Sequence, residues 1–405
     1  MTTPGGTAAL KAYYATGGPF ASAQPSEYRY LCTNVLSGTL MGDYLPIDPQ
    51  SFSQVINGGG TFTGSLNLIP GSPQQNAANL AAITPRKAVL WCLQDGVPIW
   101  AGILWDWVPT TILQNQLPVQ ASTMEFLLGK RIIDTDLVYT GADVFDMARG
   151  IVQFAFSKTP NGQVAGITYT AAESGVTDSL TFDGTQNQDC LSALGTLVST
   201  YGIEFNFRPY MDQYGNLRIS VDLGYPGLGQ PWPASGLAYN FPGNLLDYAF
   251  VATGSTGANS LIGSAQSTDA SGDSTALTGS AIDETDIGNG YPLTEQAVSP
   301  TGVTMTTGAQ VSAYCQGLLP STTATQLAPV VVLGNGQYPP LRVTQLGSYV
   351  SVAFTSAEHP AGPGGVPGFT GIGRIVSWEA FPPTQQQAEY ANIQLGAMPF
   401  EGSVL

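Results

Sequence analysis

The sequence has few charged residues, a single histidine, four cysteines and no long apolar run. Charged residues make up 10% of the 405 residues, compared with about 25% in an average soluble domain. The surface is instead expected to be rich in Thr, Ser, Gln, Asn and Gly, which favours large areas held against neighbouring subunits. Hydrophobic residues make up 43%, which is enough to bury the cores of about two to four domains.

Basic residues are especially scarce. The chain has 12 Lys and Arg against 28 Asp and Glu, which gives a formal charge of −16. Proteins that grip phosphate backbones need clustered positive charge, so this composition excludes that mode of nucleic-acid binding. We expect the chain to repel DNA, although a negative charge that only maintains solubility is an equally simple interpretation.

The cysteines Cys32, Cys92, Cys190 and Cys315 form no C-x-x-C pair and have no histidine nearby. Cys92 and Cys190 lie within apolar patterns, so we predict buried free thiols in a reducing cytoplasm rather than disulfides or metal ligands. The N-terminus lacks the basic start and hydrophobic stretch of a signal peptide. The sequence also lacks the apolar stretch of about 18 residues that a membrane-spanning helix needs.

Residues for catalysis are equally scarce. The single histidine, His359, lies in a Gly- and Pro-rich loop where we expect no rigid partner, so neither a catalytic nor a ligand role is predicted. The sequence contains no H-E-x-x-H, P-loop or G-x-S-x-G motif. We therefore predict a protein that is not an enzyme, with no catalytic, cofactor-binding or metal site.

Carboxylates cluster in two places, Asp134-Thr135-Asp136 and Asp283-Glu284-Thr285-Asp286. A calcium site built from the second cluster with Asp269 and Asp273 is conceivable, because calcium binds several oxygens from loops. The spacing of an EF-hand is missing, so solvated acids are the preferred interpretation. A glycosidase pair from distant segments stays open, but nothing in the sequence selects one.

Among the features that are present, one short pattern occurs twice, at Gly102–Trp107 and at Gly373–Trp378. The first copy ends a predicted hairpin that turns at Asp95-Gly96 and carries Ile99, Ala101, Ile103, Trp105 and Trp107 on one face. The second copy ends a hairpin that begins at 349–354 and has a long loop at 355–369. Both copies run into proline, Pro109 and Pro382. We predict that the chain contains the same β-unit twice.

Alternating patterns predict strands in both halves of the chain. The predicted strands are 28–32, 36–43, 61–68, 88–93, 99–107, 119–126, 203–208, 217–221, 245–253, 260–266, 330–333, 341–343, 348–355, 370–380 and 389–396. Three helices are predicted from their start signals. The first is capped by Thr140 and Asp143, and the others open with T-x-x-Q boxes at Thr185–Gln188 and Thr307–Gln310.

The predicted fold class is mainly β with α+β insertions, in which two related small β-barrels are accompanied by two helix-containing subdomains. The predicted divisions of the chain are an extended N-terminal arm (1–26), a first β-barrel (27–135), an α/β insertion (136–224), the start of a second β-barrel (225–300) with a polar loop (268–279), a helix-containing subdomain (301–345), and closing strands with a C-terminal tail (346–405).

Four tryptophans crowd the first hairpin, at positions 91, 100, 105 and 107. Exposed rings would stack on sugars or bases. Core packing, with one or two rings at a subunit interface, is the preferred interpretation because Trp is enriched at interfaces.

Residues 36–43, 60–68 and the hairpin Val89–Leu104, followed by a capped helix in an α/β insertion, resemble the opening barrel of phage tail-hub proteins. The segments 347–354, 371–378 and 390–395 are similar to the closing strands of the same proteins. The resemblance covers most of the chain from about residue 27 to residue 396.

The resemblance implies a structural virion protein, a baseplate hub or minor tail protein located at the tail tip and assembled in the host cytoplasm. Such a protein forms a homotrimer that adapts a sixfold tail tube to a threefold tip, closes the tube and contributes to the DNA ejection channel. The implied partners are a distal tail protein or tail tube above, a spike, fibre or other tip protein below, the tape measure protein, and genomic DNA that passes without sequence-specific binding. No extension with a lytic domain is expected after residue 396.

Three alternatives stay open. A receptor- or carbohydrate-binding tail-tip protein would share the Trp-rich hairpin, and a distal tail protein of the same tip would differ in stoichiometry. An enzyme of unrecognised type would depend on Asp or Glu for hydrolysis.

Overall fold

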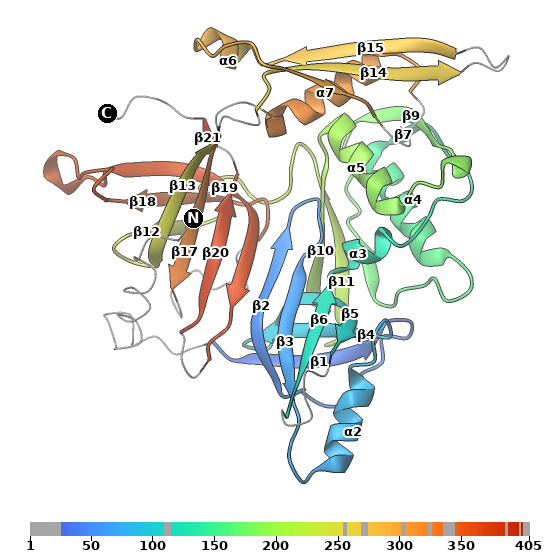
Figure 1. Cartoon of the computed structure of the whole chain (residues 1–405), viewed down its shortest axis with the longest axis vertical. Coiled ribbons are helices and arrows are strands. Elements are labelled where there is room, and N and C mark those ends of the chain that lie inside the picture. The colour runs from blue at the N-terminus through green and yellow to red at the C-terminus, as the bar shows by residue number, and fades with distance from the viewer. Residues whose placement is uncertain are drawn as a thin grey trace.

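The computed structural model describes residues 26–108, 115–253, 257–268, 274–300, 305–322, 326–334, 345–384, 388–396 and 398–399. The predicted arm lies almost entirely outside these residues, as do the predicted strand at 341–343 and the acids Asp269 and Asp273. The described chain is mainly β with α+β insertions (Figure 1), which confirms the predicted fold class.

The first half of the chain builds a six-strand unit. Its strands are β1 (Tyr28–Asn34), β2 (Ile47–Val55), β3 (Thr61–Asn67), β4 (Ala88–Gln94), β5 (Val97–Trp107) and β6 (Gln116–Ser122). They pair in the spatial order β1-β4-β5-β6-β3-β2. The hydrogen bond from the Leu45 N–H to the Tyr30 carbonyl, 2.8 Å, brings the segment before β2 back alongside β1.

The second half repeats this unit. Its strands are β12 (Leu237–Asn240), β13 (Leu245–Thr253), β17 (Gln326–Gly334), β18 (Tyr349–Phe354), β19 (Phe369–Phe381) and β20 (Tyr390–Leu395). They pair in the order β12-β18-β19-β20-β17-β13, the same permutation of chain order as in the first unit. The orientation differs in one place: β12 pairs with β18 in parallel, whereas β1 pairs with β4 antiparallel. We call these units the first and second repeats.

The register confirms the repeat at the level of single residues. The β5–β6 ladder shifts between Leu104 and Asp106, and the β19–β20 ladder shifts between Ile375 and Ser377. Each shift leaves one bulged residue, Trp105 or Val376, at the same position of the pattern that ends in tryptophan. The two copies of the pattern are therefore structurally equivalent, and the long loop of the second hairpin does not disturb the equivalence.

The two repeats carry different insertions. Helix α2 (Pro73–Ala82) lies between β3 and β4. After β6 follow α3 (Met124–Leu128), β7 (Leu137–Asp143), α4 (Val144–Ser157), β8 (Ile167–Tyr169), β9 (Thr177–Phe182), the 3-10 helix η1 (Gly184–Gln186), α5 (Cys190–Tyr201), β10 (Glu204–Met211) and β11 (Leu217–Gly224). Between β13 and β17 lie β14 (Ser260–Thr268), β15 (Ser274–Ile282), α6 (Glu284–Gly288), β16 (Glu295–Val298) and α7 (Gly308–Thr322). The 3-10 helix η3 (Pro363–Gly365) lies in the loop before β19, and β21 (Met398–Pro399) pairs with β17.

Two of the three predicted helix caps are confirmed. The Asp143 carboxylate accepts a hydrogen bond from the Phe145 N–H, 2.8 Å, at the start of α4. Thr307 and Gln310 exchange side-chain to backbone hydrogen bonds, 3.3 Å each, at the start of α7. The box at Thr185–Gln188 was wrong: α5 begins later, because Asp189 caps it by accepting from the Ser192 N–H, 2.9 Å.

Several strand predictions need correction. The predicted strand 119–126 ends at Ser122, because helix α3 begins at Met124. Residues 36–43 form turns and a single bridge, Thr33 to Leu40, because Gly38 and Gly42 adopt positive φ and break the extended run. Strand β2 was not predicted, because prolines at 46 and 49 argue against a strand. A register shift between Pro49 and Ser51 accommodates Pro49 in the β2–β3 ladder.

The polar loop predicted at 268–279 is shorter than expected. Residue 268 still belongs to β14, and Ser274–Ile282 forms β15, which pairs with β14 along its whole length. Helix α7 packs against this hairpin (Figure 1) at Gly263 and Gly279, where the missing side chains leave room for Val311 and Ser312. Packing against α7 therefore stabilises the Ser- and Thr-rich segment 274–282 as a strand.

The predicted single face of β5 was also wrong, at Ile99 and at Trp107. The bulge at Trp105 places Trp107 opposite Val119, on the face that carries Trp100 and Leu104. A register shift next to Cys92 places Ile99 in the same core as Trp100 and Leu104, whereas Ala101 and Ile103 face the core of the insertion. Both faces of β5 are thus buried over most of its length.

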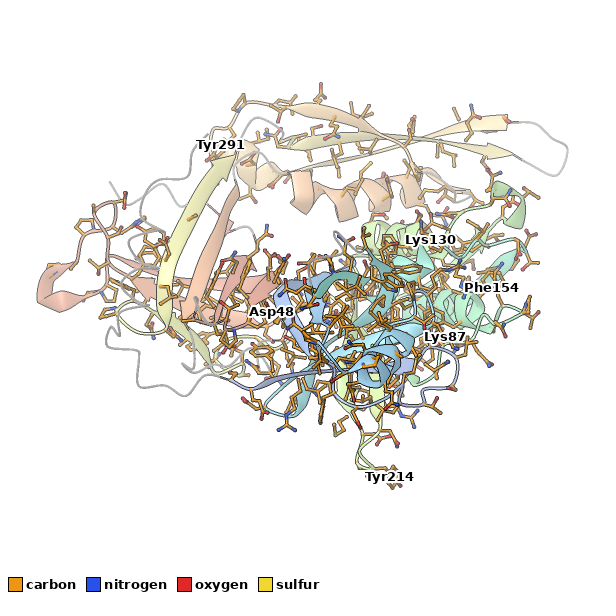
Figure 2. The ribbon with its side chains drawn as sticks, turned by 60° about the horizontal axis from the view of Figure 1, so that its bottom comes forward. Asp48, Lys87, Lys130, Phe154, Tyr214 and Tyr291 are labelled. Carbon is orange, nitrogen blue, oxygen red and sulfur yellow. The ribbon has the colours of Figure 1, made fainter. Side chains whose placement is uncertain are left out.

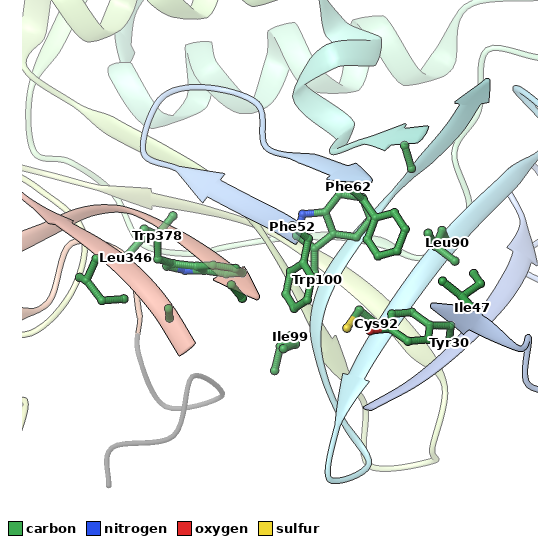
Figure 3. Close-up of a cluster of buried hydrophobic side chains, with 14 of the residues drawn as sticks. Tyr30, Ile47, Phe52, Phe62, Leu90, Cys92, Ile99, Trp100, Leu346 and Trp378 are labelled. Atoms are coloured by element: carbon green, nitrogen blue, oxygen red, sulfur yellow. The ribbon is translucent and has the colours of Figure 1, made fainter. Parts of the chain in front are cut away.

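One hydrophobic core continues through both repeats. It joins aromatic residues of the first repeat to Trp378 of the second, with Phe52, Phe62 and Trp100 at its centre (Figure 3). A second core lies between the outer face of the first repeat and the insertion that contains α4 and α5. A small third core holds α7 to the β14–β15 hairpin. The repeats are therefore one folded body rather than two separate barrels on a linker.

Candidate assembly interface

The two repeats meet where β2 of the first pairs with β19 of the second. The antiparallel register runs from Ser377 opposite Val55 to Ala380 opposite Phe52. The Ile56 N–H extends the ladder by donating to the Val376 carbonyl, 3.0 Å. The indole of Trp378 packs edge-on against the ring of Phe52, with 5.8 Å between centroids, and is 4% exposed. This junction shows how one repeat of this chain recognises another.

An ion pair fastens the insertion to the second repeat. The Arg374 guanidinium on β19 donates to both carboxylate oxygens of Glu204 on β10. Arg374 also donates to the carbonyls of Gly347 and Leu228, 3.0 Å each, and the Leu228 N–H donates to Glu204, 2.8 Å. Sequence reasoning missed this cluster, because its members lie far apart in the chain and carry no motif.

A second polar link joins the repeats on the other side of the core. The Tyr28 hydroxyl on β1 and the Gln94 amide on β4 both donate to Glu389, at 2.5 and 2.9 Å. Burial and the neighbouring carboxylate raise the pKa of Tyr28, so its hydroxyl stays protonated and donating. The two polar links and the strand junction fix the relative orientation of the repeats.

The equivalent of the junction in the first repeat is exposed. Trp107 of β5 corresponds to Trp378 but is 37% exposed, and the following Val108 is 60% exposed. In the part of the chain that the structure describes, no strand pairs with β5 beyond Ile103 on the edge opposite β6. Strand β13, which corresponds to β2, is likewise the last strand of the sheet. Among the described residues, both halves of a second junction are thus present at different places, each without a strand paired on that edge.

A hollow of about 420 Å³ lies beside the junction and is bordered by Gln54, Trp378 and residues of β10 and β11. The charged residues on its wall, Arg208 and Asp222, form an ion pair with 2.5 Å between Nε and Oδ2. The lining contains no serine, cysteine, histidine or lysine. The charged groups on the wall are thus engaged with each other.

The structure places His359 in an aromatic cluster, contrary to the expectation that it would lack a rigid partner. Its ring contacts Phe354 and Phe369 edge-on, with 5.5 Å between centroids in each case. The neighbouring Glu358 accepts hydrogen bonds from Ser356, 3.0 Å, and Tyr248, 3.1 Å. A hydrogen bond from its own backbone N–H, together with these two, holds the pKa of Glu358 below its usual value. These contacts anchor the loop between β18 and β19.

The two acidic clusters have structural partners. Asp134 pairs with Lys158, 2.7 Å, and Asp136 accepts from the Gly184 N–H, 2.8 Å. Asp283 caps α6, and Asp286 accepts from the Asn259 amide, 3.1 Å. Within the described residues, no group of three or more Asp, Glu, His or Cys side chains is arranged to hold a metal ion.

The predicted buried thiols are confirmed, since all four cysteines are free and buried. Burial raises the pKa of Cys32 and of Cys190 to about 12, so neither is a nucleophile at neutral pH. Among the crowded tryptophans, Trp91 and Trp100 are buried at 4% and 0% exposure. Core packing therefore accounts for them, as predicted, and leaves Trp107 as the exposed member.

A buried carboxylate went unnoticed in the sequence. Glu125 on α3 is 2% exposed and accepts a hydrogen bond from the Phe207 N–H, 3.3 Å. Burial raises its pKa to about 7, although hydrogen bonds from Thr123 and Phe207 offset part of the effect. It lies beside β10, whose Phe207 N–H donates to it.

No family model matches the sequence, and no curated protein matches it. Solved structures of phage tail proteins share its fold over nearly the whole chain. The tail protein from Neisseria meningitidis MC58 superposes with a TM-score of 0.56 at 13% identity, covering 91% of this chain and 97% of its own. The 43 kDa tail protein of prophage MuSo2 from Shewanella oneidensis gives 0.53 at 12% identity, covering 91% and 98%. The prophage tail protein gp18 from Listeria monocytogenes EGD-e gives 0.52 at 12% identity, covering 90% and 94%.

These likenesses confirm, at the level of the fold, the resemblance drawn from the sequence. No helix among the described residues is long and apolar enough to cross a membrane.

Proposed function

The chain has the fold of phage tail proteins, and on that premise we propose that it is the trimeric hub at the tip of a phage tail. In this role it adapts the sixfold tail tube to a threefold tip, closes the tube and lines part of the DNA ejection channel. The role is structural and not enzymatic, and its place is the tail tip of the virion after assembly in the host cytoplasm.

The duplicated six-strand unit is the observation that supports this proposal. Each chain presents two repeats with the same strand order and the same bulge position. Three chains would therefore present six similar units toward a sixfold tube, while the unequal insertions would impose threefold symmetry below. A chain with only one six-strand unit would need six copies to present six units to the tube.

The charge of the chain suits passage of DNA. With a formal charge of −16, a channel wall that carries a share of the acids would repel phosphates rather than hold them. The proposed channel should therefore be acidic in a map of the assembled particle. A neutral or basic channel, with the acids on the outer surface, would contradict this part of the proposal.

The proposed partners are the distal tail protein or tail tube above, a spike, fibre or other tip protein below, and the tape measure protein inside. The loop at 355–369 and the β14–β15 hairpin, which projects beyond α7 (Figure 1), are the proposed contacts for fibres or other tip proteins. We also propose the predicted divisions 27–135 and 136–224 as the first β-unit and its α/β insertion.

Mass measurement of the purified full chain, followed by electron microscopy of tails, tests the proposal. Three copies around a central channel are expected. Six copies around the channel would contradict the hub and favour a distal tail protein. A single copy that binds glycans would favour the receptor- or carbohydrate-binding alternative.

A further inference from the structure

Stepwise comparison of the two sheets identifies which residues of β13 correspond to β2. Gln120 on β6 and Gln394 on β20 are equivalent, because each lies opposite the residue directly after the bulge of the neighbouring strand, Asp106 or Ser377. Gln120 lies opposite Thr63, and Gln394 lies opposite Val330. One strand further out, these partners lie opposite Ser51 and Ala249 respectively. Ser51 thus corresponds to Ala249, and the segment 52–55 of the junction corresponds to 250–253.

We propose that β13 of one copy of this protein pairs with the free edge of β5 of a second copy, repeating the junction of β2 with β19. In the register of that junction, Asp106 lies opposite Thr253, Trp107 opposite Ala252, and Val108 opposite Val251 of the second copy. The number of copies that close the assembly rests on the proposed function, whereas the pairing itself rests on the repeat.

The exposure of Trp107 supports this pairing. Its counterpart Trp378 is 4% exposed because β2 and Phe52 cover it, whereas Trp107 is 37% exposed. An added strand would bury the Trp107 indole in the same way, and residue 250, which corresponds to Phe52, is also phenylalanine. Unpaired strand edges beside exposed apolar residues are sites where another chain adds.

The geometry of the contact permits a closed ring. The two unpaired halves lie at different places on the chain, so each copy offers β13 to one neighbour and β5 to another. Such head-to-tail contacts generate a ring when the rotation between copies closes. The internal junction sets the rotation between the two repeats of one chain. If the same junction also joins neighbouring copies, all adjacent repeats of the ring are related by nearly the same rotation.

A disulfide across the proposed pair tests the inference. The double variant Asp106→Cys with Thr253→Cys should form disulfides between copies and give covalent oligomers on non-reducing gels. The matched control, Val55→Cys with Ser377→Cys, carries the same pair at the internal junction and should give only cross-linked monomer. The four native cysteines are buried and should not compete.

A second variant tests the exposed tryptophan. Trp107→Lys should convert the oligomer to folded monomer, as followed by mass measurement and circular dichroism. Tyr214→Lys is the control, because Tyr214 is 80% exposed at the projecting tip of the β10–β11 hairpin (Figure 2) and belongs to neither β5 nor β13.

The outcomes separate this inference from the proposed function. A trimer without disulfides between copies, in which Trp107→Lys stays trimeric, would overturn the pairing and leave the hub intact. Disulfides between copies in an assembly other than a trimer would support the pairing and overturn the hub.

Discussion

At the residue scale, two glycines explain why the repeated pattern begins as it does. A Cβ on Gly102 would lie 2.5 Å from the Ser122 carbonyl oxygen and 2.5 Å from the Trp100 ring. A Cβ on Gly373 would lie 2.7 Å from the Leu395 Cδ1. In both repeats the following strand, β6 or β20, passes too close to the glycine for a side chain to fit. The pattern thus reflects a packing requirement shared by the two halves.

Gly102→Ala should lower the free energy of unfolding by about 2 kcal/mol or more, because the clash involves backbone that cannot move easily. Gly373→Ala should cost less, since a leucine methyl group can shift. Urea unfolding of the purified chain measures both. Gly195→Ala on α5 is the control, because its Cβ meets nothing within 4 Å and alanine favours helix, so stability should rise by about 0.5–1 kcal/mol. Equal effects at 102 and 195 would refute the packing argument.

The buried carboxyl of Glu125 makes stability depend on pH. Its pKa in the folded chain is about 7, against 4.5 when unfolded, so the folded state holds its proton more tightly. The contribution of Glu125 to stability is therefore full below about pH 4.5 and is lost as the pH rises through about 7, by about 3 kcal/mol in total.

Glu125→Gln should remove this dependence and raise the unfolding midpoint at pH 8 while changing it little at pH 4.5. Denaturant unfolding of the variant and the native chain at both pH values measures the difference. A variant less stable than the native chain at pH 8 would show that the ionised carboxylate is stabilising.

At the scale of elements, the start of α5 shows how two cap signals compete. The sequence offers a T-x-x-Q box at Thr185–Gln188, and the chain uses Asp189 instead. Both oxygens of Asp189 are engaged, with the Ser192 N–H at 2.9 Å and the Ser192 hydroxyl at 2.7 Å. Thr185 is occupied in η1, where its N–H and hydroxyl donate to Asp183. The sequence thus contains two cap signals, and the hydrogen bonds of Asp183 and Asp189 favour the later one.

Asp189→Ala should therefore lower the free energy of unfolding by about 1 kcal/mol and speed hydrogen exchange in the first turn of α5. Gln188→Ala, at the predicted but unused position, should change stability by less than about 0.5 kcal/mol. If Gln188→Ala proved the more harmful of the two, the cap would lie where the sequence pattern first suggested.

At the scale of the whole molecule, the ion pair of Arg374 and Glu204 determines how the insertion sits on the second repeat. The side chains are only 19% and 15% exposed, so neither charge is well solvated alone. Because Arg374 occupies the position equivalent to Ile103, the second repeat differs from the first where it must bind the insertion. The ion pair thus joins the second repeat to the insertion at a position where the first repeat has Ile103 instead of arginine.

Arg374→Met should destabilise the chain by about 2 kcal/mol or more, because it leaves the Glu204 carboxylate buried without its partner. Adding Glu204→Gln should restore part of the loss. Arg29→Met is the control, since the Arg29–Glu27 pair is 46% and 62% exposed and should contribute little. Thermal unfolding of the four proteins tests this, and no recovery in the double variant would contradict the proposed coupling.

The sequence by itself determined the mainly β class, the hairpin at Asp95-Gly96, the repeated pattern and the caps of α4 and α7. These features follow from side-chain alternation, turn residues and capping residues, which act over a few neighbours. Only the tertiary structure decided that β2 is a strand despite its prolines, that residues 36–43 are not, and that β2 joins β19. The pairing of β2 with β19 depends on contacts between segments hundreds of residues apart, whose energy local patterns do not contain. The positive φ of Gly38 and Gly42 and the register shift at Pro49 belong to the folded backbone, and the alternation of side chains does not reveal them. For the same reason, the exposed edge of β5 became visible only after its counterpart in the second repeat was found buried.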